Sequence, residues 1–234
     1  IEGGSFISEL GGAKKQKESL FGLIRSVNAL REGQAAVGAD TCNKICIWDS
    51  LMDSKSSMLT GNTSTMYAVG FLNLLKDGPT VIDLPPGMLG ILDDMEFKYM
   101  TDLGVAGPDK GKGGKFLVLP PGYDGEVPGG YFVVRSSTYM NFSFIRANAA
   151  KVGFGDKAIK YYQDNAKVYP LKSGPRAPVV KNVSNIAWNS LVPEDASAFE
   201  WMHEIINYEP AEAFGKELLG RLASVGIVQG QPFE

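Results

Sequence analysis

The amino-acid sequence predicts an α+β protein, in which an antiparallel β-sandwich lies between an N-terminal helix and a set of C-terminal helices. Two observations support this fold class. Apolar residues recur at helical spacing only toward the two ends of the 234-residue chain, and short β-branched and aromatic runs occupy residues 44–146 between them. Such separation of helices from strands is typical of α+β folds, whereas a parallel sheet would require alternating strands and helices.

The first expected element is a helix within residues 13–31. Its apolar side chains recur at intervals of three and four residues, and Gly33 follows as a stop signal. The apolar positions are Leu20, Leu23, Ile24, Val27 and Leu30. We therefore assign residues 1–36 to an N-terminal helical segment.

Short runs of strand-forming residues come next, separated by turns rich in Gly and Pro. The runs are KICIW (44–48), TMYAVGFLNL (65–74), TVIDL (80–84), KFLVL (115–119), YFVVRSS (131–137) and YMNFSFI (139–145). In the last run Met140, Phe142 and Phe144 share one face, and Asn141 and Ser143 share the other. This alternation predicts a sheet with one face on the core and the other in water. We assign residues 37–150 to a β-rich core.

The helical period returns in residues 151–234. The stretch DKAIKYYQDNAKVYPL (156–171) predicts a helix that has Asp156 as its N-cap and ends before Pro170. Residues 171–185 are broken by Pro and Gly, so we expect them to cross the surface as a connector. Two further helices are expected in residues 193–227, the second of them ending at Gly226.

Composition excludes two classes of partner. The chain has 23 basic and 26 acidic residues and a formal net charge of −3, so it lacks the excess of cations that a nucleic-acid-binding face requires. No apolar run approaches the roughly 20 residues of a membrane-spanning helix. We therefore expect neither a nucleic-acid partner nor a membrane span.

Metal-ligating and nucleophilic residues are scarce. His203 is the only histidine, and Cys42 and Cys46 are the only cysteines, which is too few nitrogen and sulfur ligands for a tetrahedral zinc site. The sequence contains no G-x-S-x-G element and no complete dinucleotide-binding fingerprint. We expect no metal site and no cofactor, and we interpret the two thiols as small buried apolar groups.

The loop GPDKGKGGK (107–115) is open to two interpretations. A phosphate-binding Walker loop requires Ser or Thr after its Gly-Lys pair, but here Phe116 follows Lys115. A nest of glycine amides with Lys110, Lys112 and Lys115 can hold a carboxylate or a sulfate. A solvated turn with glycines at positive φ explains the same composition. Lys115 is kept as a candidate ligand-binding residue.

Four carboxylates lie close together in GILDDMEFKYMTDLG (90–104). If this segment is a strand, Asp94, Glu96 and Asp102 share a face and Asp93 lies opposite. Two carboxylates in one cleft can supply a general acid and a general base. The alternative is an acidic face that is solvated or paired with neighbouring lysines. Asp94 and Asp102 are therefore candidate catalytic residues.

The stretch LTGNTSTMYAV (59–69) combines a turn with a polar strand face. Asn62 can bond its own backbone in the turn, and Thr65 and Tyr67 then share one face of the strand that follows. Such a face can recognise a sugar or an amide. It can equally be the solvent face of a sheet.

Four motifs together resemble the DUF1254 family, which usually occurs in tandem with DUF1214. They are LTGNTSTMYAVGFLNL, GPTVIDLPPG, DLGVAGPDKGKGGKFLVLPPGYDGEVPGGYFVVRSST and LLGRLASVGIVQGQPF. The family's Pro-Asn-x-Asp-Thr-x-Tyr element falls on residues 61–67, with Gly61 in place of the proline and Ser64 in place of the aspartate. The aspartate of its central strand falls on Asp94, and its Arg-Ser-x-Thr element falls on residues 135–138.

This resemblance implies a partly jelly-roll-like core with a hairpin at residues 114–128. It also implies bacterial export to the periplasm or the exterior, and a second, DUF1214-like domain or other subunits as partners beyond residues 151–234. It implies no activity, because the family is named for lacking one.

Three functions are consistent with these observations. The first is an exported module that binds a small molecule or a glycan on a concave sheet face. That face is expected to be lined by Asn62, Thr65, Tyr67, Asp94 and Arg135. The second is a hydrolase or lyase in which Asp94 acts with Asp102 or Arg135. The third is a structural or assembly subunit.

Overall fold

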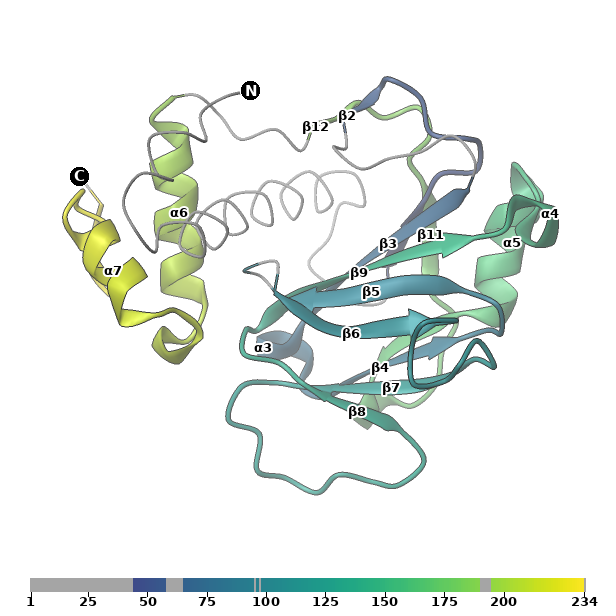
Figure 1. Ribbon diagram of the computed structural model, residues 1–234, viewed down its shortest axis with the longest axis horizontal. Coiled ribbons are helices and arrows are strands. Elements are labelled where there is room, and N and C mark those ends of the chain that lie inside the picture. The colour runs from purple at the N-terminus through teal and green to yellow at the C-terminus, as the bar shows by residue number, and fades with distance from the viewer. Residues whose placement is uncertain (1–43, 58–64, 95, 97, 190–194, 234) are drawn as a thin grey trace.

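The structure is a computed structural model that describes residues 44–57, 65–94, 96, 98–189 and 195–233. Its strands form two large sheets and one small one, accompanied by several helices (Figure 1). The helix expected within residues 13–31 lies outside the described residues. The mixed α and β content agrees with the prediction, but the separation of strands from helices holds only in part. All described strands precede α6 and α7, whereas α3, α4 and α5 lie between strands.

The larger sheet has six strands in the order β11-β1-β3-β9-β5-β6. They are β1 (Lys44–Ile47), β3 (Met66–Asn73), β5 (Leu89–Asp94), β6 (Tyr99–Gly104), β9 (Met140–Ala147) and β11 (Val179–Asn182). All neighbours are antiparallel except β1 and β11. The expected connector therefore contributes an edge strand, β11, which its broken sequence pattern does not predict.

The smaller sheet has four strands in the order β10-β4-β7-β8. They are β4 (Thr80–Leu84), β7 (Gly114–Leu119), β8 (Phe132–Arg135) and β10 (Lys167–Pro170). The expected hairpin at residues 114–128 is wrong, because β7 and β8 pair in parallel. Parallel neighbours need a crossover of about a dozen residues, and residues 120–131 provide it. A separate pair joins β2 (Ser56–Ser57) to β12 (Trp188–Asn189).

The helices are mostly short. They are α3 (Leu74–Asp77), α4 (Ala149–Val152), α5 (Asp156–Asn165), α6 (Ser197–Tyr208) and α7 (Lys216–Ala223), with 3-10 helices η1 (Leu171–Ser173) and η2 (Ala211–Ala213). The helix predicted from residue 156 ends earlier than expected, and Asp156 is its first residue rather than its N-cap. The reason is that Val168 and Tyr169 are buried in strand β10 against the smaller sheet.

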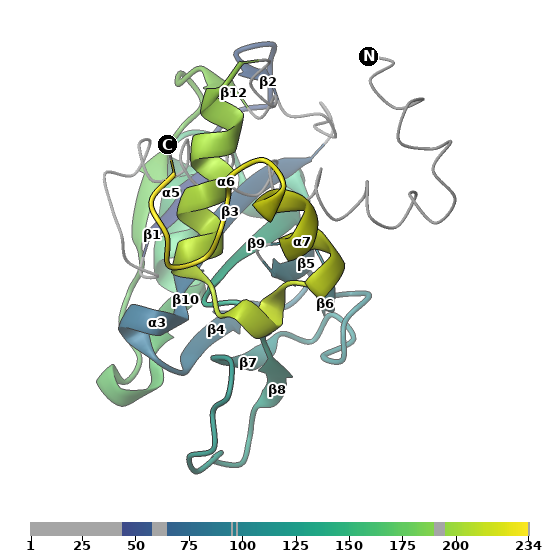
Figure 2. The same ribbon diagram turned by 90° about the vertical axis from the view of Figure 1, so that its left-hand side faces the viewer.

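A hydrophobic core lies on each face of the six-stranded sheet. The first fills the space between the two large sheets, with α5 at its side, and contains Met66, Leu72, Ile82, Leu92, Phe116, Val118, Ile145, Ala158 and Tyr162. The second lies between the opposite face and the C-terminal helices, and contains Trp48, Tyr67, Phe71, Phe142, Phe144, Met202, Ile206, Phe214 and Leu222. Figure 2 shows α6 and α7 in front of the strands of this sheet.

These two cores overturn the expectation of a solvated face on β9. Asn141 and Ser143 are 1% and 3% exposed. Both are hydrogen-bonded: the Asn141 amide oxygen accepts from Ser136 Oγ at 2.7 Å, and Ser143 Oγ donates to the Gly70 carbonyl at 3.4 Å. The alternation in the sequence assigns the side chains of β9 to the two faces of the sheet correctly. Both faces are covered, however, one by the smaller sheet and the other by the C-terminal helices. Buried polar side chains are tolerated in such a strand when they are hydrogen-bonded.

The lysine-rich loop at residues 107–115 contains its own anion. Asp109 is 4% exposed, and its carboxylate accepts the backbone N–H groups of Gly104 at 2.8 Å and Gly113 at 3.1 Å. The three lysines of the loop, Lys110, Lys112 and Lys115, are exposed. An internal carboxylate therefore occupies the Gly113 amide, one of those that the anion-binding interpretation assigned to an external ligand, and ties the loop to the end of β6 through Gly104.

Gly104 joins β6 to this loop in a backbone conformation that favours glycine. Its φ is +83°, and a Cβ at this position would lie 2.0 Å from the Met88 carbonyl oxygen. Gly104→Ala is therefore expected to lower the free energy of unfolding by at least about 2 kcal/mol. Urea denaturation of this variant and of Gly129→Ala tests the expectation. A Cβ at Gly129 would meet no other atom within 4 Å, so an equal effect of both substitutions would contradict it.

Candidate functional site

An open pocket of about 430 Å³ lies between the two large sheets. Strand β6 is one edge of the six-stranded sheet and β8 is one edge of the four-stranded sheet, and residues of both strands line the pocket. The lining residues are Asp94, Lys98, Tyr99, Met100, Thr101, Val133, Val134, Arg135 and Ser137. The site is therefore built from two sheet edges and from the turn between β5 and β6.

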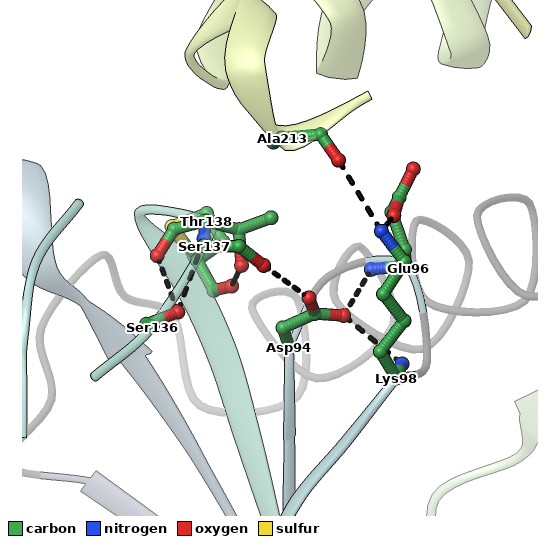
Figure 3. Close-up of polar contacts among 8 residues, drawn as sticks. Asp94, Glu96, Lys98, Ser136, Ser137, Thr138 and Ala213 are labelled. Atoms are coloured by element: carbon green, nitrogen blue, oxygen red, sulfur yellow. Dashed lines mark hydrogen bonds and ion pairs between the residues drawn. The ribbon is translucent and has the colours of Figure 1, made fainter. Parts of the chain in front are cut away.

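Asp94 organises this turn. It is 1% exposed, and its Oδ1 atom accepts the backbone N–H groups of Glu96 at 2.9 Å and Lys98 at 3.0 Å. Its Oδ2 atom accepts from Ser137 Oγ at 2.6 Å (Figure 3). A short aspartate side chain that bonds the amides following it is a common way to form a turn. Here the same carboxylate also ties the turn to the segment between β8 and β9.

Burial raises the pKa of Asp94 above its usual value, and the hydrogen bonds from Ser137 and Lys98 oppose this rise. Asp93, its neighbour in β5, has a pKa raised to about 6 by burial and by the nearby charges of Asp94 and Asp102. Loss of solvent stabilises the neutral form of a carboxyl, whereas hydrogen bonds to the ionised form stabilise the charge. Asp94, which lines the pocket, is therefore more basic than an ordinary surface carboxyl, and Asp93 lies beside it in β5 without lining the pocket.

Lys98 connects the pocket to the C-terminal helices. Its ammonium group forms an ion pair with Glu96, whose side chain is fully buried, and donates to the Ala213 carbonyl at 3.3 Å (Figure 3). Removing one partner of such a pair leaves an uncompensated buried charge. The ammonium group of Lys98 is thus engaged in contacts within the protein.

Arg135 is the second cation that lines the pocket, besides Lys98. It is exposed at the end of β8, and its Nη1 atom donates to the Tyr123 carbonyl at 3.1 Å. A guanidinium has five N–H donors in a fixed planar arrangement. Within the described part of the chain, this bond uses one of the five donors of Arg135. The other donors can therefore bind an anion in the pocket.

The structure brings together only part of the predicted site. Asp94 and Arg135 line one pocket. Asp102 lies on β6 but does not line it, and its carboxylate accepts from the Tyr99 hydroxyl at 2.9 Å. Lys115 is exposed on β7, opposite Asp83 of β4, and does not line it either.

The polar face expected around Tyr67 is not an open surface. Tyr67 is 0% exposed and stacks on Phe144, with ring centroids 4.9 Å apart. Trp48 meets its ring edge-on and the Arg146 guanidinium lies over it. The C-terminal helices cover this face of the sheet, which the alternation of a single strand cannot reveal. Thr65 is half-buried ahead of β3, and Asn62 lies outside the described residues.

Among the described residues, the remaining candidates Cys46 and His203 do not form a reactive centre, and Cys42 lies outside those residues. Burial raises the pKa of the Cys46 thiol to about 12, so the thiol stays protonated and unreactive. His203 lies on α6, where a ring nitrogen contacts the Gln231 carbonyl at 2.8 Å. Within the described residues, no three His, Cys, Asp or Glu side chains are grouped to hold a metal.

Residues that sequence reasoning missed complete the site. Ser137 occupies the variable position of the Arg-Ser-x-Thr element. Its neighbours match the family motif, but the motif does not select Ser137 itself. Glu209 carried none. It is 2% exposed, and its carboxylate accepts the backbone N–H groups of Tyr139 and, at 2.9 Å, Met140. Burial raises the pKa of Glu209 to about 7.

Comparisons with known proteins agree with this fold. A family model described as "Protein of unknown function (DUF1254)" matches residues 42–170. A crystal structure of the VPA0106 protein from Vibrio parahaemolyticus superimposes with a TM-score of 0.60 at 16% sequence identity, and the match covers 92% of this chain and 51% of that one. This chain thus spans about half the length of that relative. At such identity the likeness concerns the fold alone.

Other comparisons add little. An uncharacterised protein from Burkholderia cenocepacia gives a TM-score of 0.33 at 12% identity, over 70% of this chain and 43% of that one. Comparison with curated proteins finds no match. No helix among the described residues is long and apolar enough to cross a membrane.

Proposed function

Since this chain belongs to DUF1254, a family of unknown function, we propose from its geometry that it binds a small organic acid bearing hydroxyl groups in the pocket between β6 and β8. The observation that supports this proposal is the presence of Arg135 and the buried Asp94 in one pocket. An arginine fork suits a carboxylate. The Asp94–Ser137 pair offers acceptors for ligand hydroxyls.

The rest of the lining favours a ligand of mixed character. Thr101 and Tyr99 add polar hydroxyl oxygens, whose protons are donated to Asp102, whereas Met100, Val133 and Val134 provide apolar walls. A concave site with apolar walls and a few placed polar groups is typical of small-molecule recognition. Acid sugars have this combination of a carboxylate, hydroxyls and an apolar ring face, which brings a glycan-derived ligand within the proposal.

The wider setting is part of the same proposal. We place the protein in the periplasm or outside the cell, with a second, DUF1214-like domain or other subunits beside it. The family resemblance supports this setting, as does the greater length of the relative from Vibrio parahaemolyticus. The lining residues named above are present in this chain, so we propose to test binding on this chain itself.

Arg135→Gln provides the test. Calorimetric titration with glucuronate and with glucose compares two pyranoses that differ in the carboxylate. We expect glucuronate to bind the unmodified protein better than glucose, and Arg135→Gln to weaken glucuronate binding about tenfold or more, as loss of a charge-assisted hydrogen bond does. Arg176→Gln, at an exposed position of the connector, is the matched control. Glucuronate binding that is equal in both variants would contradict the proposal.

One observation favours catalysis as a second candidate function. Asp94 has a raised pKa and shares the pocket with a cation, which suits a general acid or base of a hydrolase or lyase. Asp102 does not line the pocket, so within the described residues Arg135 is the stronger partner for Asp94. Mass spectrometry of a uronic-acid disaccharide incubated with the protein distinguishes the two functions. An unchanged mass supports binding, and a changed mass that Asp94→Asn abolishes supports catalysis.

A further inference from the structure

The C-terminal helical unit, defined as α6, η2 and α7 with the residues between them, is joined to the sheet beside the pocket by two polar links. The first is the hydrogen bond from Lys98, which lines the pocket, to Ala213 of η2. The second is Glu209, which follows α6 and turns its carboxylate onto the amides of Tyr139 and Met140. Both links connect the C-terminal helical unit, which packs on an apolar face of the six-stranded sheet, to turns beside the pocket.

A short chain of contacts leads from Glu209 to Asp94. Tyr139 directly follows a tight turn that is closed by the Thr138 backbone N–H, which donates to Ser136 Oγ at 3.1 Å, while the same hydroxyl donates to the Asn141 amide oxygen at 2.7 Å. The middle residue of that turn, Ser137, donates to Asp94 (Figure 3). Because the turn is closed by its own hydrogen bond, a shift at Tyr139 moves it as a unit.

We propose that Glu209 is a positioning residue of the pocket, whose ionised carboxylate fixes the 136–138 turn and thereby the Ser137 hydroxyl against Asp94. The inference rests on the proposed function, since it assigns a control to the same site. A carboxylate accepts two amides at once, whereas its protonated form has one strong acceptor fewer. Protonation of Glu209 therefore loosens one of the two amides and the turn attached to it.

The charges that face Glu209 come from several elements. Burial is the main cause of the raised pKa of Glu209, the charge of Asp94 at the end of β5 raises it further, and Tyr208 of α6 lies beside it. Lys98 and Glu96, from the turn between β5 and β6, form their own ion pair. With a pKa of about 7, Glu209 changes its charge near neutral pH. The arrangement of the pocket is expected to change over the same range.

Amide NMR spectra recorded from about pH 5 to about pH 9 without ligand test this inference. We expect the amides of Ser137, Tyr139 and Met140 to shift together with one midpoint near 7, and those of Glu96 and Lys98, which report on Asp94, to follow. In Glu209→Gln this common titration is lost. Glu212→Gln is the matched control, because Glu212 is exposed three residues away, and it is expected to retain the titration.

Two results would overturn the inference. One is a titration confined to Tyr139 and Met140 while Ser137 stays constant, which leaves Glu209 a local anchor of β9. The other is an unchanged titration in Glu209→Gln. If that variant does not fold, the spectra of the unmodified protein decide between a shared and a confined titration. Glucuronate binding measured at about pH 6 and about pH 8 then reports on the proposed function separately, because its absence leaves the ligand-free spectra unaffected.

Discussion

Replacing Asp94 by alanine is expected to lower the free energy of unfolding by about 3 kcal/mol. The substitution removes the acceptor of the Glu96 and Lys98 amides and of the Ser137 hydroxyl. Each buried donor left without a partner costs about 1–3 kcal/mol, and the loss of a charge that was itself costly to bury offsets part of the sum. Urea denaturation monitored by the fluorescence of the chain's tryptophans measures the change.

Asp94→Asn is the matched control for that experiment. Its amide oxygen can still accept the Glu96 and Lys98 amides, so we expect a smaller loss, about 1 kcal/mol. A loss for Asp94→Ala no larger than that for Asp94→Asn would show that this carboxylate does not hold the turn. The pocket would then lack the organising group on which our account depends.

Stability is expected to fall as the pH rises from about 4 to about 7. Glu209 has a pKa of about 7 in the folded protein and an ordinary value of 4.5, and Asp93 has a pKa of about 6 against 3.8. Both pKa values are raised by folding, so the folded protein binds more protons than the unfolded chain within this range. Stability is therefore fully present below the ordinary values and is lost as the pH passes the folded ones. For Glu209 alone the change amounts to roughly 3 kcal/mol.

Urea denaturation at a series of pH values checks this sign. The unmodified protein is expected to lose stability across the range, and Glu209→Gln is expected to lose less. Asp93→Asn should remove a separate part of the slope at lower pH. A stability that rises steadily from about pH 4 to about pH 7, as paired surface carboxylates produce, would contradict the burial of both groups.

The local pattern of the sequence predicted the strands better than their pairing. TVIDL became β4 over the expected residues, and the other apolar runs became strands with small differences at their ends. Pairing depends on long-range packing. The parallel partnership of β7 with β8, and the recruitment of β11 to the edge beside β1, carry no signal in the runs themselves.

The residues of the site that could be predicted from the sequence are those with charged side chains. Asp94 and Arg135 were selected as a charged pair and do line one pocket. Tyr67 was selected for a polar strand face, but its exposure depends on helices about 130 residues later in the chain. Glu209 was overlooked because an acidic residue at a helix end is usually solvated, and only the packing of the C-terminal helical unit shows that it is buried.

Titration with glucuronate followed by amide NMR shows whether the edges of two sheets, β6 and β8, form the binding site. We expect titration with glucuronate to shift the amides of Tyr99–Thr101 and Val133–Arg135, and to leave those of α6 and α7 nearly unchanged. Shifts confined to α6 and α7, or no shifts at all in the two edge strands, would contradict this location of the site.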